Sequence, residues 1–362
     1  MERREQGTYW SGNYMKNKRL IYVDILNIIC CIAVVGLHMN ASSWKYSEAS
    51  YWKQSLIAEV LLYFAVPVFF MISGATLLGY RERYSTKEFL IRRAYRIVLP
   101  YCIWALAYWV ISIIFGDQPF SSLSVEERIF SAINAITAYR SQNIFWFIQE
   151  LINVYLCMPI LSLLVGEQHS KLRRYLIGVT ILSVILLPLI EQFTPIAFGD
   201  HSSLNIAGGY ILYILLGYEL STINLRKRWI LPLCLASVIV MLIKYLTTIH
   251  LSTIAGALDS RLYGYISIWA LIPSVTVFYA IKCVNWEHIL PISVQRWLAV
   301  ISGCSLGIYF IHLIIVEVFA KLTNTDTYDI IYRTIGIMVV YCISGTIVMV
   351  MKRIPIIKKL VP

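Results

Sequence analysis

The chain has 362 residues, of which 59% are hydrophobic and only 14% are charged. Soluble domains are about a quarter charged, so this composition excludes an ordinary soluble domain and favours a polytopic membrane protein. The formal net charge of +11 does not indicate nucleic-acid binding, because the basic residues lie in short segments between apolar runs.

About ten apolar runs have the length of roughly 20 residues that crosses a bilayer. The first follows a basic segment, as in a signal peptide, but it is too long for the apolar core of one and predicts a retained span. We therefore predict an all-α bundle of about ten transmembrane helices in a single domain, residues 1–362. The predicted spans are 20–42, 55–79, 95–115, 144–165, 173–193, 206–222, 229–250, 263–284, 298–320 and 329–351.

Positive charges orient these spans. With an even number of spans, one set of connections includes both ends of the chain, and it holds most of the 31 Lys and Arg residues. The positive-inside rule places that set in the cytoplasm. We therefore expect both termini to be cytoplasmic, with basic segments at 1–19 and 352–362.

Three polar side chains interrupt the first span. Asp24 and Asn27 lie near its cytoplasmic end, and His38 lies about 16 Å beyond Asn27, near the outer end. Together with Cys31 they share one helix face, which is typical of a face turned toward the bundle interior. The alternative for His38 is a hydrogen-bonded core histidine.

Three other spans place polar residues at a similar depth. Glu59 lies in the second span and Glu150 in the fourth. A carboxylate beside an imidazole can hold a catalytic base in the right tautomer and orientation, so His38, Glu59 and Glu150 are candidate catalytic residues. The alternative is that both glutamates lie at the interface and contact water. The fourth and ninth spans supply the candidate substrate-binding residues Trp146, Asn153, Ser302, Ser305, Tyr309 and His312.

Arg92, Arg93 and Arg96 open the third span on its cytoplasmic side. Arginines at a helix N-terminus suit phosphate, through bidentate donors and the helix dipole. Positive charge at this position also serves to orient a span. The spacing does not decide between a phosphate site and a topological signal.

The eight cysteines lie in or at the edges of apolar runs, where they are expected to be small buried residues. Cys30 and Cys31 are adjacent, which suits neither a C-x-x-C redox motif nor spaced zinc ligands. The sequence predicts no metal site.

Five segments resemble, in chain order, the integral-membrane acyltransferase family 3. Members of this family O-acylate surface glycans, and one branch O-acetylates enterobacterial common antigen. The segments are DIL…VVGLH, VPVFFMISGATLLG, RRAYRIVLPY, FWFIQELINVYLCMPI and ISGCSLGIYFIH, and together they span nearly the whole chain.

The resemblance implies a multi-pass O-acetyltransferase of the bacterial inner membrane. Acetyl-CoA is then the donor, and a glycan or lipid-linked saccharide is the acceptor. His38 matches the essential histidine of the family, and Arg93 and Arg96 match its arginine pair, which with Arg92 would hold the CoA phosphates.

One position departs from the family. Asn27 stands where the family usually places an arginine, eleven residues before the histidine. Either Asp24, Asn27 and a neighbouring cation share the role of that arginine, or the donor binds differently. A transporter or exporter on the same scaffold is the alternative function, because a polar interior also suits transport. The sequence leaves a homo-oligomer open.

Overall fold

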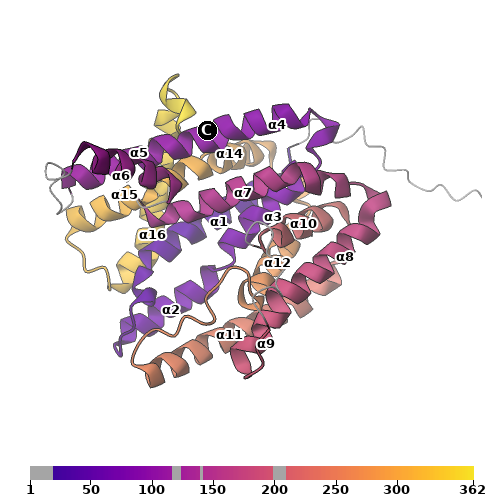
Figure 1. The fold of residues 1–362 in the computed structure, drawn as a ribbon, viewed down its shortest axis with the longest axis horizontal. Helices are drawn as coiled ribbons and strands as arrows, with labels where there is room; N and C mark the ends of the chain where they lie inside the picture. Colours follow the sequence, from indigo (N-terminus) through magenta and orange to yellow (C-terminus); the bar gives the residue numbers. More distant parts are fainter. Residues whose placement is uncertain (1–18, 116–123, 139–141, 199–208) are drawn as a thin grey trace, which may run out of the picture.

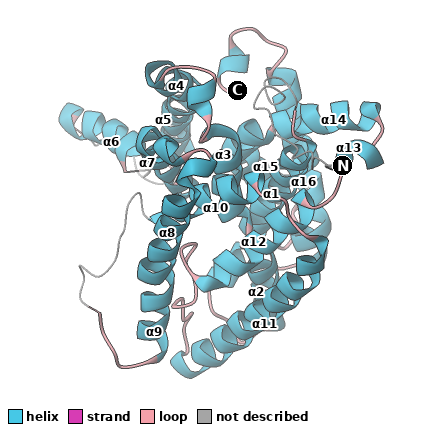
Figure 2. Cartoon of the chain, turned by 90° about the vertical axis from the view of Figure 1, so that its right-hand side faces the viewer, coloured by secondary structure: helices cyan, strands magenta, loops and turns pink. Residues whose placement is uncertain are grey.

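The computed structural model describes residues 19–115, 124–138, 142–198 and 209–362, and these form helices joined by loops, with no strand among them (Figure 2). The helices, labelled in Figure 1, are α1 (Ile21–Met39), α2 (Ser50–Leu62), α3 (Ala65–Leu77), α4 (Thr86–Arg93), α5 (Leu99–Phe115), α6 (Val125–Thr137), α7 (Trp146–Leu161), α8 (Ser170–Ile181), α9 (Leu187–Phe193), α10 (Ile211–Thr222), α11 (Ile230–Ala255), α12 (Ile268–Lys282), α13 (Trp286–Ile289), α14 (Ile292–Gly303), α15 (Ser305–Thr323) and α16 (Ile330–Met351).

Within the described ranges, eight helical segments are long and apolar enough to cross a membrane. They correspond to eight of the predicted spans, and the sixth and eighth predicted spans correspond to the shorter apolar helices α10 and α12. The all-α membrane architecture is confirmed. The count of about ten spans and the cytoplasmic side of the termini stay predictions.

Prolines explain two irregularities within the predicted spans. A proline has no N–H for the carbonyl four residues earlier. Before Pro67 the chain turns at Tyr63 and Phe64, so the predicted second span consists of two helices, α2 and α3. Before Pro100 the helix widens into a π-helical turn over Ala94–Val98, which joins α4 to α5. The predicted ninth span is also divided, at Cys304, into α14 and α15.

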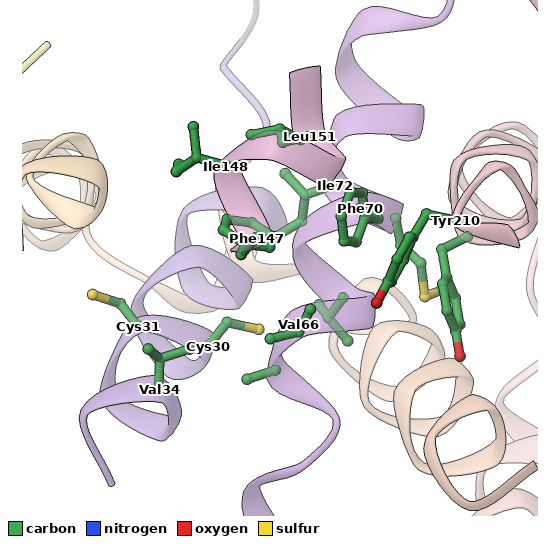
Figure 3. Packing of buried hydrophobic residues seen from close by; sticks show 14 of the residues in the cluster. Cys30, Cys31, Val34, Val66, Phe70, Ile72, Phe147, Ile148, Leu151 and Tyr210 are labelled. Carbon is green, nitrogen blue, oxygen red and sulfur yellow. The ribbon is translucent and has the colours of Figure 1, made fainter. Parts of the chain in front are cut away.

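The central helix is α1, which packs against α3, α12, α14, α15 and α16. Figure 3 shows part of this core, in which Cys30 and Val34 of α1 lie near Val66 of α3, and Phe147 of α7 lies beyond them. All four side chains are buried. Because these apolar side chains are buried together, the helix faces that carry them on α1, α3 and α7 are turned toward one another.

Two glycines let α3 and α10 cross at close range. A Cβ atom on Gly74 would lie 2.0 Å from the carbonyl oxygen of Ile214, and one on Gly217 would lie 2.0 Å from that of Met71. Small residues allow such approaches between helices in membranes. The short helix α10 is thereby held inside the bundle, with residues 211–215 fully buried.

The C-terminal segment, predicted as a basic tail, folds back onto the bundle. The indole Nε1 of Trp104 on α5 donates to the carbonyl oxygen of Leu360 at 3.0 Å, and Val361 is fully buried. Figures 1 and 2 both place α4, α5, α14 and the C-terminus at one end of the molecule, opposite α2, α9 and α11.

Candidate active site

The polar faces predicted for the first and ninth spans lie against each other. Asn27 Nδ2 donates to Ser302 Oγ at 3.3 Å, and the thiol of Cys31 donates to the backbone oxygen of Ser305 at 3.7 Å. Further along both helices, the rings of His38 and His312 lie with their centroids 5.0 Å apart. These pairs form a polar path between α1 and the α14–α15 segment. We call the end at the two histidines the histidine end.

His312 is fully buried, and its tautomer follows from its hydrogen bonds. Nδ1 lies 2.8 Å from the carbonyl oxygen of Tyr309 and 3.2 Å from that of Ile308. A carbonyl oxygen only accepts, so Nδ1 carries the proton and Nε2 carries a lone pair. Nε2 is buried and has no hydrogen-bond partner in the described part of the chain. His312 therefore presents a free basic nitrogen next to His38, which is partly buried.

A small cavity adjoins this histidine pair. Its volume is about 10 Å³, which admits one water molecule at most. The lining residues come from α1, α3 and α15, namely Cys31, Val34, Val35, Phe69, Ser305, Ile308, Tyr309 and His312. A larger cleft of about 300 Å³ lies at the start of α1, beside Lys282 and Trp286, and includes none of the predicted site residues.

The structure does not place either candidate carboxylate beside His38. Glu59 is buried between α2 and α11, where it accepts a hydrogen bond of 3.4 Å from Ser43 Oγ and interacts electrostatically with Lys244. Glu150 lies near Tyr210, and its Oε2 atom is buried without a partner. Within the described ranges, no hydrogen bond or ion pair joins either glutamate to His38 or His312. The expected carboxylate–imidazole contact is replaced by a contact between two imidazoles.

The remaining candidate substrate-binding residues lie in different surroundings. Trp146 stacks on Tyr265 with centroids 5.3 Å apart, and the Tyr309 hydroxyl donates to the carbonyl of Ile144. Ser305 Oγ is buried without a partner, whereas Asn153 is exposed. The structure therefore gathers Ser302, Ser305, Tyr309 and His312 along one path, while Asn153 lies on an open face of α7.

The expectation that Arg92, Arg93 and Arg96 open a helix is wrong, because they lie within the helical segment Thr86–Phe115, whose N-terminus lies about two turns earlier. The three arginines differ in their partners. Arg92 is paired with Glu88 at 2.6 Å. Arg93 lies over the rings of Phe89 and Tyr155, and its Nε atom is buried without a hydrogen-bond partner. Arg96 is exposed and has no acidic partner within the described ranges. Arg93 and Arg96 therefore offer unpaired guanidinium groups, and we call this region the basic end.

Two further cations lie at the basic end. Arg19 holds both carboxylate oxygens of Asp24, at 2.7 and 2.8 Å, and also donates to the carbonyl oxygen of Ala299. Lys352 Nζ donates to the carbonyl oxygen of Gly303 at 2.7 Å. Partial burial lowers the pKa of Lys352, and the nearby charge of Arg96 lowers it further. Arg19 is thus the neighbouring cation that the sequence left open beside Asp24 and Asn27.

The sequence predicts no role for Lys244, although a lysine inside an apolar span is itself a signal of a polar site. It also predicts no role for Tyr265, and it predicts only a topological role for Arg19 and Lys352. The positions of these two cations beside Asp24 and Gly303 depend on how the ends of α1, α14 and α16 meet.

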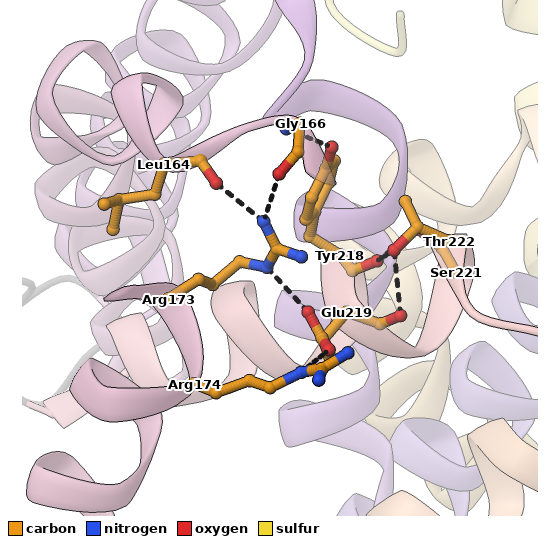
Figure 4. Close-up of polar contacts among 8 residues, drawn as sticks. All are labelled: Leu164, Gly166, Arg173, Arg174, Tyr218, Glu219, Ser221 and Thr222. Carbon is orange, nitrogen blue, oxygen red and sulfur yellow. Dashed lines mark hydrogen bonds and ion pairs between the residues drawn. The ribbon is translucent and has the colours of Figure 1, made fainter. Parts of the chain in front are cut away.

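A different charged cluster has all of its partners. Figure 4 shows Arg173 of α8, which is 2% exposed, bonded to Glu219 of α10 at 2.6 Å and to the carbonyl oxygens of Leu164 and Gly166. Arg174 bonds the second oxygen of Glu219 at 2.6 Å. This cluster ties α8 to α10 and leaves neither oxygen of Glu219 free.

These observations define an integral-membrane protein with a line of polar contacts between α1 and the α14–α15 segment, two histidines at one end and unpaired arginines at the other. The model of the acyltransferase domain family, acyltransferase family 3, matches residues 20–353. The chain belongs to this family and is a multi-pass membrane acyltransferase. Neither a search of curated proteins nor a search of solved structures found a match.

Proposed function

We propose that this acyltransferase takes an acetyl group from cytoplasmic acetyl-CoA and transfers it to a hydroxyl of a cell-surface or lipid-linked polysaccharide in the bacterial inner membrane. The observation that carries the proposal is the polar path between α1 and the α14–α15 segment. It connects the unpaired arginines at the basic end to the imidazoles of His38 and His312 through the contacts Asn27–Ser302 and Cys31–Ser305. Donor and acceptor sites on opposite faces of a membrane require such a path.

Arg93 and Arg96 would bind the phosphates of CoA, because both guanidinium groups lack acidic partners and one buried donor is unused. Arg92, which is paired with Glu88, would add positive potential rather than a direct contact. Asp24 would hold Arg19 at the same end, and Asn27 would hold Ser302. The pantetheine arm would then follow the path toward His38.

His38 would act as the general base. The acceptor hydroxyl oxygen forms the new ester bond with the acetyl carbonyl carbon, and its proton passes to His38. The carbon–sulfur bond of the thioester breaks, and the leaving thiolate of CoA takes the proton from His38. His312 would stabilise the protonated imidazole, because its free Nε2 lone pair lies in the neighbouring ring.

On the acceptor path, Trp146, Glu150, Tyr309 and Ser305 would contact the saccharide, whereas Asn153, on the open face of α7, would not. Trp146 and Tyr309 supply aromatic surface, and Glu150 supplies an unused buried oxygen.

The test is to supply purified protein in lipid nanodiscs with acetyl-CoA labelled in the acetyl group. We expect release of free CoA and transfer of the label to added saccharide, or slow hydrolysis when no saccharide is present. A transporter or exporter on this scaffold would leave the thioester intact. Intact acetyl-CoA in the presence of polysaccharide would therefore contradict the proposal.

A further inference from the structure

Several buried polar atoms without partners meet between α2, α11 and the loop that follows α11. Lys244 is 1% exposed, and its Nζ has no hydrogen-bond partner. Thr248, one turn further along α11, is equally buried and its hydroxyl is also unpaired. The hydroxyl of Tyr263, in the loop, is buried and unpaired as well. Glu59 of α2, 2% exposed, completes the group.

These atoms belong to one cluster. Lys244 Nζ lies 3.5 Å from the centroid of the Tyr63 ring and 4.8 Å from that of Tyr263. Glu59 interacts electrostatically with Lys244 and with Tyr263, yet no direct ion pair joins Glu59 to Lys244 in the described chain. Contact with aromatic faces offsets only part of the cost of burying an ammonium group.

Folded proteins pair nearly all of their buried polar groups, so several unpaired atoms in one place require an explanation. A structural network such as Arg173–Glu219 has its partners within the chain. In this cluster Lys244 Nζ, Thr248 Oγ1 and the Tyr263 hydroxyl lack partners in the described chain, whereas Glu59 accepts a hydrogen bond of 3.4 Å from Ser43 Oγ. The missing partners are therefore expected to belong to a bound polar molecule.

We propose that Glu59, Lys244, Thr248 and Tyr263 form a site, the Glu59–Lys244 site, that binds hydroxyl groups of the saccharide acceptor; this rests on the proposed function. An ammonium group only donates and a carboxylate only accepts, while the Thr and Tyr hydroxyls do both. Saccharide hydroxyls also donate and accept, so they match all four groups at once. An anion would be repelled by Glu59 and a cation by Lys244.

The aromatic rings around the site support a saccharide and link it to the histidines. The Tyr63 ring, which faces Lys244, also stacks on Tyr265 with centroids 4.3 Å apart. Tyr265 stacks in turn on Trp146. Tyr265 also interacts with Tyr309, whose ring centroid lies 6.0 Å from that of His312. A saccharide held at the Glu59–Lys244 site would thus extend along aromatic surface toward His38.

The site lies close to the molecular surface. Tyr263 is only partly buried, and Trp44, which is 50% exposed, packs edge-on against it with centroids 4.8 Å apart. We expect a ligand to enter past these two rings. Rotation of the Tyr263 side chain would admit a ligand without unfolding a helix.

The test uses isosteric variants that should not impair folding. Thr248→Val and Tyr263→Phe each remove one unpaired hydroxyl, and Thr253→Val is the matched control on α11, since its hydroxyl is exposed and bonds to Ile249. Full-length protein in nanodiscs is titrated with the methyl glycosides of glucose, galactose, mannose and N-acetylglucosamine, and affinity is measured by thermal stabilisation. We expect at least one glycoside to bind the wild type and the control equally.

The two hydroxyl variants should bind that glycoside about 2- to 10-fold more weakly, and Lys244→Met about 10- to 100-fold more weakly, as expected for neutral and charged hydrogen bonds. The proposal is overturned if no glycoside of the panel binds, or if all variants bind as the wild type does; the cluster then holds only water. Because this binding needs no acetyl-CoA, it is separate from acyl transfer. If the wild type binds the glycoside but transfers no acetyl group, only the proposed function is contradicted. If it transfers the acetyl group but the three variants bind the glycoside as the wild type does, only the site is contradicted.

Discussion

Two buried charged clusters in this protein differ in whether their atoms are satisfied. In the first, Glu219 has each oxygen bonded to an arginine, and Arg173 also reaches two backbone carbonyls. In the second, Lys244 and Glu59 are equally buried but lack a direct ion pair, and Lys244 contacts aromatic rings instead. Burial alone therefore does not distinguish a structural charge from a functional one. We expect the number of unused hydrogen-bonding atoms to make this distinction.

Buried residues outside these two clusters also differ in whether their hydrogen-bonding atoms have partners. Arg333 is 2% exposed, and its guanidinium donates to Tyr51, Gln54, Ser55 and Tyr328. Its partners identify a residue that ties α16 to α2. By contrast, His312 Nε2 and Arg93 Nε are buried and unused. The unused atoms lie at the two ends of the proposed path, which is where substrates would supply the missing partners.

The largest test concerns the sides of the membrane, because the predicted orientation would place the Arg173–Glu219 cluster toward the cytoplasm and the Glu59–Lys244 cluster in the outer half. A reporter that is active only in the cytoplasm should give full signal when fused after Pro362 and none when inserted near Thr325. The reverse pattern would invert the placement of His38 and remove the basis of the proposed mechanism.

Among the unsatisfied groups, the histidines should give the largest loss of activity. His38→Ala should lower acyl transfer by about 10²–10⁴-fold, as expected for loss of a general base, while CoA affinity stays unchanged. His38→Gln should be nearly as inactive, since glutamine cannot take the proton. His312→Gln should be milder. If His38→Gln kept normal transfer while His38→Ala failed to accumulate, His38 would be a core residue and the base would have to be His312.

For the satisfied cluster, the large effect should be on stability. Glu219→Ala leaves Arg173 buried without its counter-ion and should lower the free energy of unfolding by about 3–5 kcal/mol. The matched control is Glu88→Ala, because the Glu88–Arg92 pair is exposed and should cost less than about 1 kcal/mol. Denaturant unfolding in detergent measures both. Equal losses would mean that the partners of Glu219 do not stabilise the fold.

The basic end should show a binding effect without a stability effect. Replacing both Arg93 and Arg96 with Ala should weaken CoA binding well over tenfold, because a charge-assisted hydrogen bond contributes about 1.5–3 kcal/mol. The control removes Arg226, Lys227 and Arg228, which lie before α11 and are equally basic. Calorimetric titration with CoA compares the two variants. A similar loss in both would show that Arg93 and Arg96 serve only to orient the span.

The smallest effect should distinguish two buried threonines. Thr276→Val leaves the Ser237 hydroxyl, which donates to it at 2.7 Å, without its acceptor and should cost about 1–3 kcal/mol. Thr248→Val removes a hydroxyl that has no partner, so the free energy of unfolding without ligand should stay unchanged or rise slightly. Thermal unfolding measures the difference. Comparable destabilisation would show that Thr248 has a partner in the folded chain.

The chain's own sequence determined the membrane class, the positions of eight membrane-crossing segments and the polar face of α1. These features follow from composition and helical periodicity, which are local properties. It also predicted that the serines and His312 of the ninth span share a path, because residues spaced by whole helical turns must lie on one side. The prolines that divide or widen the spans were visible, but their effect depends on how neighbouring helices replace the lost hydrogen bonds.

Only the tertiary structure decided which polar groups meet. Depth along a helix axis placed Glu59 and His38 at a similar level, yet the rotation of α2 turns Glu59 toward Lys244 and leaves His38 beside His312. Depth fixes one coordinate of a side chain, whereas a contact requires three. The other two depend on how the helices are packed around α1, and close crossings such as that of Gly74 with α10 set this packing.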